Sequence, residues 1–250
     1  MPEILSEDQI SYYSTHGFVR VPGVLSPEEV ARFQAAALDL STHGEILSNQ
    51  PVFLQMVNVW TQSEEMKALT QHPGIGGLAE QLAGVPLRIW HDQILIKKPH
   101  NEAPTEFHQD QPYWPHLESP NPITAWIALC DVPVERGCMT FIPGSQQRTD
   151  LPAQNLSDAK SLFGICPELA WDERVTLPLR AGDCTFHHGR CAHMATPNFT
   201  DDPRVAHAII YMDAGTLFSG KPHPVTQPLG LAVGDALDGE VFPRVADFES

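Results

Sequence analysis

The sequence predicts a mainly β protein in which helices pack against the outside of a jelly-roll core. Three observations predict this fold class. Helix start signals occur within the first 85 residues, short β-rich runs begin at residue 88, and glycine, proline, asparagine and aspartate separate these runs. Many short strands divided by turn residues are typical of antiparallel sandwiches and barrels.

Two helices are expected near the N-terminus because two serines have the form of a capping box. Ser6 is followed by Gln9, and Ser26 is followed by Glu29 with Pro27 at the favoured first helical position. Between these helices, "GFVRVPGVL" (17–25) alternates like a strand. The rest of the first 85 residues reads mainly as helix.

The β-rich region of the chain begins with "RIWHDQILIKK" at residue 88. Later strands are expected within 124–132, 138–145, 174–188 and 204–214. Segments 149–172 and 216–243 are rich in proline, glycine and polar residues, which predicts long surface loops of the kind that form the lid or mouth of a site. We expect one domain, made of a helical N-terminal segment (1–85), a jelly-roll core of about 88–215 and a C-terminal extension (216–250).

The charge of the chain argues against two kinds of partner. Its 250 residues include 15 basic and 31 acidic residues, a formal net charge of −16. Such a charge repels nucleic acid and anionic membranes, so we expect neither as a partner. No export signal and no run of roughly 18 to 20 apolar residues is present. We expect a cytoplasmic monomer or homodimer that acts on a small molecule and keeps its cysteines reduced.

The segment "EFHQDQPYW" (106–114) places His108 and Asp110 two residues apart. On a β-strand, such residues point to the same face and can converge on one ion. Only this pair follows a strand-rich region, which makes it the candidate metal site, with an ordinary hydrogen-bonded pair as the alternative. The same spacing occurs at a helix end and in two loops: His43 and Glu45, His100 and Glu102, His116 and Glu118.

A third ligand is sought in "AGDCTFHHGRCAHMATPN" (181–198), which contains His187, His188 and His193. Two imidazoles and one carboxylate on one face of Fe(II) leave positions open for a chelating cosubstrate and O₂. An anionic chelator needs a cationic anchor. Arg204 begins the next strand, and its guanidinium matches a carboxylate bidentately; the alternative for Arg204 is a surface salt bridge.

Five segments of the chain carry a resemblance to a known family: "WHDQILIKKP", "FHQDQPYW", "AWIALCDVPVERGCMTFIPGS", "GDCTFHHGRCAH" and "PN-x₅-R", in this order. Together they resemble the phytanoyl-CoA dioxygenase family of Fe(II)/2-oxoglutarate-dependent oxygenases. The similarity extends from about residue 10 to about residue 245 and implies a double-stranded β-helix, the cupin-like jelly roll. It also implies Fe(II), 2-oxoglutarate and O₂ as cofactors.

The resemblance implies a role for each candidate of the metal site. His108, Asp110 and His193 would hold the iron, and Arg204 would pair with the far carboxylate of 2-oxoglutarate. His187 and His188 are then expected to be packing residues or neighbours of the ligands. Since adjacent strand residues face opposite ways, only one of these two can point into the barrel.

Further cosubstrate contacts are implied for Trp126 and Gln93. Several family members carry a serine two residues after the distal histidine, where this chain has Ala195. Thr196 is the expected replacement for that hydroxyl. Lys97 and Lys98 are further candidates for contact with the cosubstrate or the substrate, for which solvated positions at a sheet edge are the favoured alternative.

Three residues that follow the His-x-Asp pair are candidates for substrate contacts: Tyr113, Trp114 and His116. The alternative is an aromatic rim that packs beneath a loop. The function implied by the resemblance is hydroxylation of an unactivated C–H bond of a small-molecule metabolite, with release of succinate and CO₂. A non-catalytic metal- or ligand-binding jelly roll is the alternative, and a zinc-dependent hydrolase is a weaker one.

Overall fold

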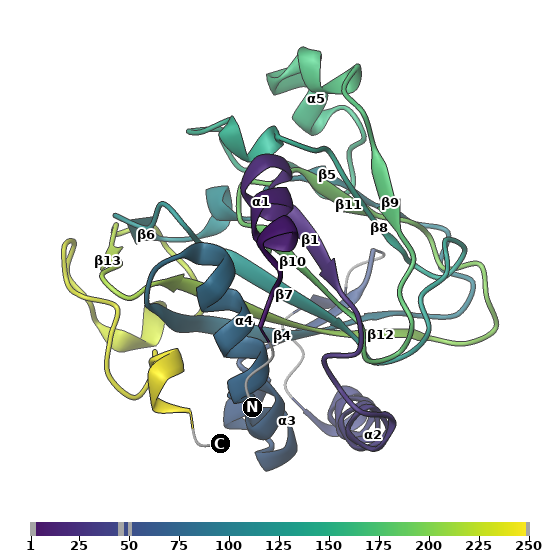
Figure 1. Cartoon of the computed structure of the whole chain (residues 1–250), viewed down its shortest axis with the longest axis horizontal. Helices are drawn as coiled ribbons and strands as arrows, with labels where there is room; N and C mark the ends of the chain where they lie inside the picture. Colours follow the sequence, from purple (N-terminus) through teal and green to yellow (C-terminus); the bar gives the residue numbers. More distant parts are fainter. Residues whose placement is uncertain (1–3, 45–47, 50–51, 249–250) are drawn as a thin grey trace.

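The computed structural model describes residues 4–44, 48–49 and 52–248 of the chain (Figure 1). Its α-helices are α1 Glu7–His16, α2 Pro27–His43, α3 Glu64–Thr70, α4 Pro73–Ala83 and α5 Ser161–Ile165. Its strands are β1 Phe18–Val21, β2 Ser48–Asn49, β3 Leu54–Val57, β4 Leu87–Lys97, β5 Thr105–His108, β6 His116–Leu117, β7 Ile123–Ala128, β8 Met139–Phe141, β9 Val175–Leu177, β10 Cys184–His188, β11 His193–Ala195, β12 Arg204–Asp213 and β13 Leu217–Phe218. Short 3-10 helices are η1 Val59–Thr61, η2 Gln111–Tyr113, η3 Ser145–Gln147, η4 Pro167–Ala170, η5 Gln227–Leu229 and η6 Val245–Asp247.

The strands form two main antiparallel sheets. A seven-stranded sheet has the order β1-β10-β7-β12-β4-β3-β2, and a four-stranded sheet has the order β5-β11-β8-β9. A two-stranded ribbon of β13 and β6 lies at one end (Figure 1). The expected mainly β, double-stranded β-helix fold is therefore confirmed.

The first two helices begin where the capping boxes predict. The Ser6 and Ser26 side chains each accept a hydrogen bond from the backbone N–H three residues on, and the Gln9 and Glu29 side chains each accept one from the backbone N–H of the cap. Apolar faces of α2, α3 and α4 cover the large sheet on its outer side (Figure 1). Their buried residues Phe33, Met66 and Leu78 belong to one core with Ile94 and Ile209 of the sheet.

The inner face of the large sheet is set by the register of three central strands. Gln93 of β4 and Trp126 of β7 both lie beside Ala208 of β12, and Lys97 lies beside Arg204. Because side chains alternate along a strand, these residues share the face that looks toward the small sheet. The side chains of β4, β7 and β12 that are candidates for the site thus lie on one face of the large sheet, although these strands are far apart in the sequence.

Three expectations about elements are corrected. Residues 48–57 contain β2 and β3, which extend the edge of the large sheet, although the first 85 residues read mainly as helix. The segment 149–172 contains α5 and η4, and 216–243 contains β13 and η5. Glu45, of the first rejected His-x-acid pair, lies outside the described residues. Among the helices described, none has the length and apolar character needed to cross a membrane.

Candidate active site

A cavity of about 450 Å³ lies between the two sheets. The large sheet contributes alternate residues of its central strands, including His91, Gln93 and Leu95 of β4. The small sheet contributes Thr105 and His108 of β5, Met139 of β8 and His193 and Ala195 of β11. Segments 149–172 and 216–243 both supply wall residues, Ala153 and Leu156 from the first and residues 221–224 from the second. The two loops expected at a mouth therefore border this cavity.

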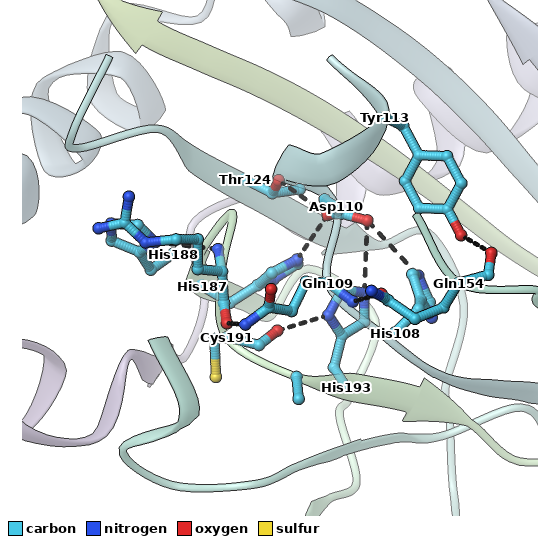
Figure 2. A network of polar contacts seen from close by, with 12 residues as sticks. His108, Gln109, Asp110, Tyr113, Thr124, Gln154, His187, His188, Cys191 and His193 are labelled. Carbon is cyan, nitrogen blue, oxygen red and sulfur yellow. Dashed lines mark hydrogen bonds and ion pairs between the residues drawn. The ribbon is translucent and has the colours of Figure 1, made fainter. Parts of the chain in front are cut away.

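His108, Asp110 and His193 meet at the cavity wall. One ligand atom from each of the three lies within 4.8 Å of the others, the one such group found among the described residues. Nε2 of His108 lies 3.4 Å from Oδ1 of Asp110, and Nε2 of His193 lies 3.8 Å from the same oxygen. Figure 2 shows these imidazoles converging on the Asp110 carboxylate. The arrangement has the spacing of ligands around one metal ion.

Two elements bring the three side chains together. β11 pairs with β5, which places His193 directly opposite His108. Asp110 does not share that strand, because β5 ends at His108 and Asp110 has helical backbone angles at the start of η2. The expectation that His108 and Asp110 lie on the same face of one strand is therefore wrong. Asp110 reaches the site from a turn just beyond the strand.

Gln109 fixes the backbone between the two ligands of the His-x-Asp pair. Its side chain is fully buried and is not part of the cavity wall. Its Nε2 lies 2.7 to 3.3 Å from the carbonyls of Ser145, Arg148 and Arg190, and its backbone N–H donates to Gln154. Because both the side chain and the backbone of Gln109 are hydrogen-bonded, the turn is rigid and the positions of His108 and Asp110 relative to each other are fixed.

Hydrogen bonds to the backbone set the ring tautomers of the two candidate histidine ligands. Nδ1–H of His108 donates to the carbonyl of Glu106 at 2.7 Å, and Nδ1–H of His193 donates to the carbonyl of Cys191 at 2.9 Å. A carbonyl can only accept, so each proton stays on Nδ1 and each Nε2 presents a lone pair to the site. This is the state of a metal-ligating imidazole.

The protonation states also fit a metal. Burial, with the neighbouring His108 next in effect, lowers the pKa of His193 to about 3, so this imidazole is neutral at neutral pH. Burial alone would raise the pKa of Asp110, but the three imidazoles around it hold that pKa well below its usual value. A neutral imidazole and an ionised carboxylate are the forms that bind a divalent cation.

His187 lies beside Asp110. Of the two roles expected for it, a packing residue or a neighbour of the ligands, the structure corresponds to the second. Its Nε2 is 3.4 Å from Oδ2 of Asp110, the oxygen not shared with His108 and His193. His188 points the other way, where its ring contacts the carbonyl of Pro120 and the backbone N–H of Arg190. The expectation that only one of this pair points inward is confirmed.

Arg204 lines the cavity as a buried cation for which the described residues supply no counter-charge. Its side chain is 2% exposed, so the surface salt-bridge alternative is wrong. The guanidinium donates to the carbonyl of Leu95 at 3.2 Å and lies 5.2 Å from the ring centre of Trp126, while its Nε is buried without a partner. No ion pair among the described residues includes it. A buried unpaired charge is costly, which points to a carboxylate ligand.

Gly137 allows the close approach of the chain to this cation. A Cβ at this position would lie 2.9 Å from Nε of Arg204 and 3.2 Å from Cδ of Lys97, and the backbone φ is +69°. Both the space and the backbone conformation therefore require glycine.

Lys97 corrects another expectation, because it is fully buried instead of solvated. It lies in the interior of the large sheet, where β4 pairs with both β12 and β3, and its Nζ donates to the carbonyl of Ala103 at 2.8 Å. Burial, and then the charge of Arg204, lower the pKa of Lys97 to about 7. Lys98, the next residue, is exposed.

Replacing Lys97 by methionine should raise the free energy of unfolding at neutral pH, because a buried charge is removed and the stem volume is kept. With its folded pKa at about 7 and an unfolded value near 10.4, the unfolded chain binds more protons between these values, so native stability rises with pH across that window. Lys97→Met should flatten this rise. Urea unfolding at about pH 7 and about pH 9.5 measures it, and exposed Lys98→Met is the control. If stability rises with pH as much in Lys97→Met as in native protein, Lys97 is not the buried group whose lowered pKa causes the rise.

Trp126 and Gln93, the other expected cosubstrate contacts, both line the cavity. Trp126 lies against the Arg204 guanidinium, and Gln93 receives a hydrogen bond of 2.6 Å from Nε2 of Gln55 on the neighbouring strand β3. Their contact with a cosubstrate stays a prediction.

Thr196 does not take the place expected for it. Its hydroxyl donates to the carbonyl of Val134 at 2.6 Å and accepts from the backbone N–H of Cys138 at 2.8 Å. The residue is not among those of the cavity wall, where Ala195 stands instead. The physical reason is strand alternation, which turns the residue after Ala195 to the other face.

Two of the three residues proposed to contact the substrate line the cavity, and the third does not. Tyr113 and Trp114 line the cavity, and the Tyr113 hydroxyl donates to the carbonyl of Gln154 (Figure 2). His116 does not belong to the wall; its ring packs 4.6 Å from that of Trp90, and neither ring nitrogen has a hydrogen-bond partner among the described residues. For His116 the structure corresponds to the packed-aromatic alternative.

Several wall residues are not identified by any sequence motif: Phe53, Gln55, His91, Lys221 and His223. Phe53 and Gln55 lie in a segment that the sequence predicts as mainly helical. His91 is buried, and its Nδ1 contacts the carbonyl of Asp92 at 3.2 Å. The period-two pattern of β4, which puts His91 on the face of Gln93, is the signal that could have found it.

A jelly-roll cavity with two histidines, one carboxylate and a buried arginine defines the class of non-heme iron, 2-oxoglutarate-dependent enzymes. A family model described as phytanoyl-CoA dioxygenase (PhyH) matches residues 13–206. The chain belongs to the phytanoyl-CoA dioxygenase family, a family of dioxygenase-type enzymes.

Curated relatives share half or more of their length with the chain. Phytanoyl-CoA dioxygenase domain-containing protein 1 of Mus musculus is 28% identical over 159 residues, which cover 61% of this chain and 55% of that protein. The chain thus spans about half the length of this relative and of its counterpart in Rattus norvegicus. L-proline trans-4-hydroxylase of Streptomyces griseoviridis is 25% identical over 240 residues, 86% of this chain and 88% of that protein.

Two solved structures are more similar. The α-ketoglutarate-dependent carbocyclase SnoK from nogalamycin biosynthesis is 40% identical, with a TM-score of 0.86 over 96% of each chain. The epimerase SnoN, in complex with Fe³⁺, α-ketoglutarate and nogalamycin RO, is 38% identical, with a TM-score of 0.86 over 96% of this chain and 98% of that one. These relatives confirm the expected cofactors, iron and 2-oxoglutarate, with O₂ as the usual cosubstrate.

Proposed function

We propose that the protein is an Fe(II)- and 2-oxoglutarate-dependent oxygenase that breaks an unactivated C–H bond of a small molecule and releases succinate and CO₂. The observation that carries the proposal is the meeting of His108, Asp110 and His193 in the same cavity as the buried, unpaired Arg204. We assign the three as iron ligands and Arg204 as the anchor of the far carboxylate of 2-oxoglutarate.

Each residue has a defined task in this proposal. When bound, iron supplies the position at which 2-oxoglutarate and O₂ react and the oxidising power for the C–H bond. His187, at Oδ2 of Asp110, holds the carboxylate orientation. Leu95, Trp126 and Ala208 form a wall that keeps water from the buried end of the cosubstrate.

Hydroxylation is the first candidate for the outcome, supported by the similarity to a proline hydroxylase. A second candidate is ring closure or epimerisation at a carbon of a ring system, which the higher identity to SnoK and SnoN favours. Hydroxylation, ring closure at an unactivated carbon and inversion of a stereocentre share one step, because each breaks a bond from carbon to hydrogen.

Succinate formation tests the proposed function. Protein loaded with Fe(II) without oxygen, then given O₂ and 2-oxoglutarate, should form succinate slowly alone and faster with a substrate from a screen of ring-containing metabolites. Zn²⁺-loaded protein is the matched control, since Zn²⁺ accepts the same ligands and has no redox chemistry. Absence of succinate from the Fe(II) form would favour a binding protein, and a hydrolytic activity of the Zn²⁺ form would favour a zinc hydrolase.

A further inference from the structure

Two histidines in the cavity wall have no role in holding iron or 2-oxoglutarate as proposed above. His91 lies on β4, and His223 lies in the segment 221–224 that borders the cavity from the C-terminal side. Their rings are nearly parallel, with centres 5.7 Å apart and planes at 27°. Two distant segments of the chain thus place a pair of imidazoles side by side in the wall.

His91 presents a hydrogen-bond acceptor to the cavity. Its Nδ1 lies 3.2 Å from the carbonyl oxygen of Asp92, which can only accept. The ring proton is therefore on Nδ1, and Nε2 carries a lone pair. Nε2 has no hydrogen-bond partner within residues 4–44, 48–49 and 52–248 and is not sealed from the cavity.

His223 presents a donor. Its Nδ1 accepts from the backbone N–H of Val225 at 3.2 Å, so in the neutral ring the proton is on Nε2. This Nε2–H also has no partner among the residues that the structure describes. The backbone therefore fixes opposite tautomers in the two rings.

The opposite tautomers are stable at neutral pH. Burial, and then the nearness of His223, lower the pKa of His91 to about 3, and burial followed by the charge of Lys221 lowers the pKa of His223 to about 4. Both rings are then neutral, and the wall keeps one acceptor and one donor next to each other.

The surroundings of the pair are aromatic. The same cavity is lined by Phe53, Tyr113, Trp114 and Trp126, which favour a flat ring over a flexible polar chain. A ring that bears a hydroxyl group offers an O–H donor and an oxygen acceptor at one edge, the complement of the two imidazoles.

We propose that His91 and His223 are specificity-determining residues that hold a hydroxyl-bearing aromatic or fused-ring substrate, His91 accepting from its O–H and His223 donating to its oxygen. This inference rests on the proposed function, because it names the substrate class for that site. It is separate from iron and 2-oxoglutarate binding, since no hydrogen bond or ring contact in the described part of the chain joins either histidine to the candidate ligands or to Arg204.

The test uses 2-naphthol and its methyl ether, 2-methoxynaphthalene, as probes. The ether keeps the ring and the oxygen acceptor and lacks the donor. Binding is followed by quenching of tryptophan fluorescence in Zn²⁺-loaded protein with 2-oxoglutarate, a form that does not turn over. Native protein should bind 2-naphthol more tightly than the ether by roughly twofold to tenfold, the effect of one neutral hydrogen bond.

Variants separate the two roles. His91→Phe should abolish the preference for 2-naphthol, and His91→Gln, which restores an acceptor, should recover some of it. His223→Phe should weaken both probes and keep the preference. His116→Phe is the control and should leave both affinities unchanged, because His116 lies outside the wall.

Three results would overturn the inference: equal affinity of native protein for the two probes, binding of neither probe up to its solubility, or a preference that survives in His91→Phe. None of these measurements depends on succinate formation. A failure here leaves the oxygenase proposal standing, and a failure of succinate formation leaves these affinities measurable.

Discussion

Replacing Asp110 by alanine is expected to abolish turnover, with a loss on the order of a thousandfold or more. The carboxylate is the one anionic ligand of the proposed set, and both histidine Nε2 atoms lie within 3.8 Å of it. Its removal leaves two neutral imidazoles, which bind Fe(II) more weakly and leave a position open on the metal.

The metal-free Asp110→Ala protein should remain folded. The Asp110 carboxylate contacts the three imidazoles at 3.4 to 3.8 Å and the Thr124 hydroxyl at 3.5 Å, and Asp110 is not a member of the hydrophobic core clusters. The positions of His108 and His193 depend on their own bonds to Glu106 and Cys191 and on the pairing of β5 with β11. The loss of activity is therefore expected without a loss of structure.

The measurement compares succinate formation and Fe(II) affinity in native and Asp110→Ala protein, with circular dichroism as the check on folding. Glu102→Ala is a matched control, because Glu102 has the same spacing from a histidine and is exposed away from the cavity. It should keep native activity. Turnover near the native level in Asp110→Ala would show that the ligand assignment is wrong.

The sequence was most informative where local chemistry determines structure. Capping at Ser6 and Ser26 depends on residues three positions away, and both capping boxes form as expected. The β-rich runs around Trp126 and Arg204 form strands whose residues are all buried, and they lie at the centre of the large sheet. Such signals need no knowledge of the rest of the chain.

Local sequence patterns do not predict contacts between residues that are far apart in the sequence. Lys97 looks like an edge lysine in the sequence, and it is buried because Arg204 of β12 pairs with it on one side while β3 pairs with β4 as far as Ile96 on the other. The choice of His193 over His187 came from the family resemblance, since both histidines end up near Asp110. The pairing of His91 with His223 depends on how the C-terminal segment folds back, for which the sequence holds no motif.

Arg204→Ala is expected to weaken 2-oxoglutarate binding by about 30-fold to several-thousand-fold, about 2 to 5 kcal/mol. The reason is the sheltered position of the guanidinium, which is 2% exposed and has a buried Nε without a partner. Removing it leaves the far carboxylate of the cosubstrate unpaired at the buried end of the cavity. An exposed ion pair would contribute only about 0 to 1 kcal/mol.

Iron affinity should change little in Arg204→Ala, because Arg204 is not a proposed ligand. Since alanine leaves a cavity in a packed sheet, Arg204→Met is the second variant, which fills the space without the charge. Both should lose cosubstrate affinity to a similar extent. Arg204→Lys keeps the charge and loses the bidentate fork, so its affinity should fall between native and Arg204→Met.

The measurement is an anaerobic titration of the Fe(II) proteins with 2-oxoglutarate, followed by the metal-to-ligand charge-transfer band. Arg136→Ala is the control, since Arg136 contacts the carbonyl of Pro203 next to Arg204 and does not belong to the cavity wall. Its titration should match that of native protein. If Arg204→Met also matched the native curve, Arg204 would be removed from the cosubstrate site, and Lys97, the neighbouring buried cation, would become the candidate anchor.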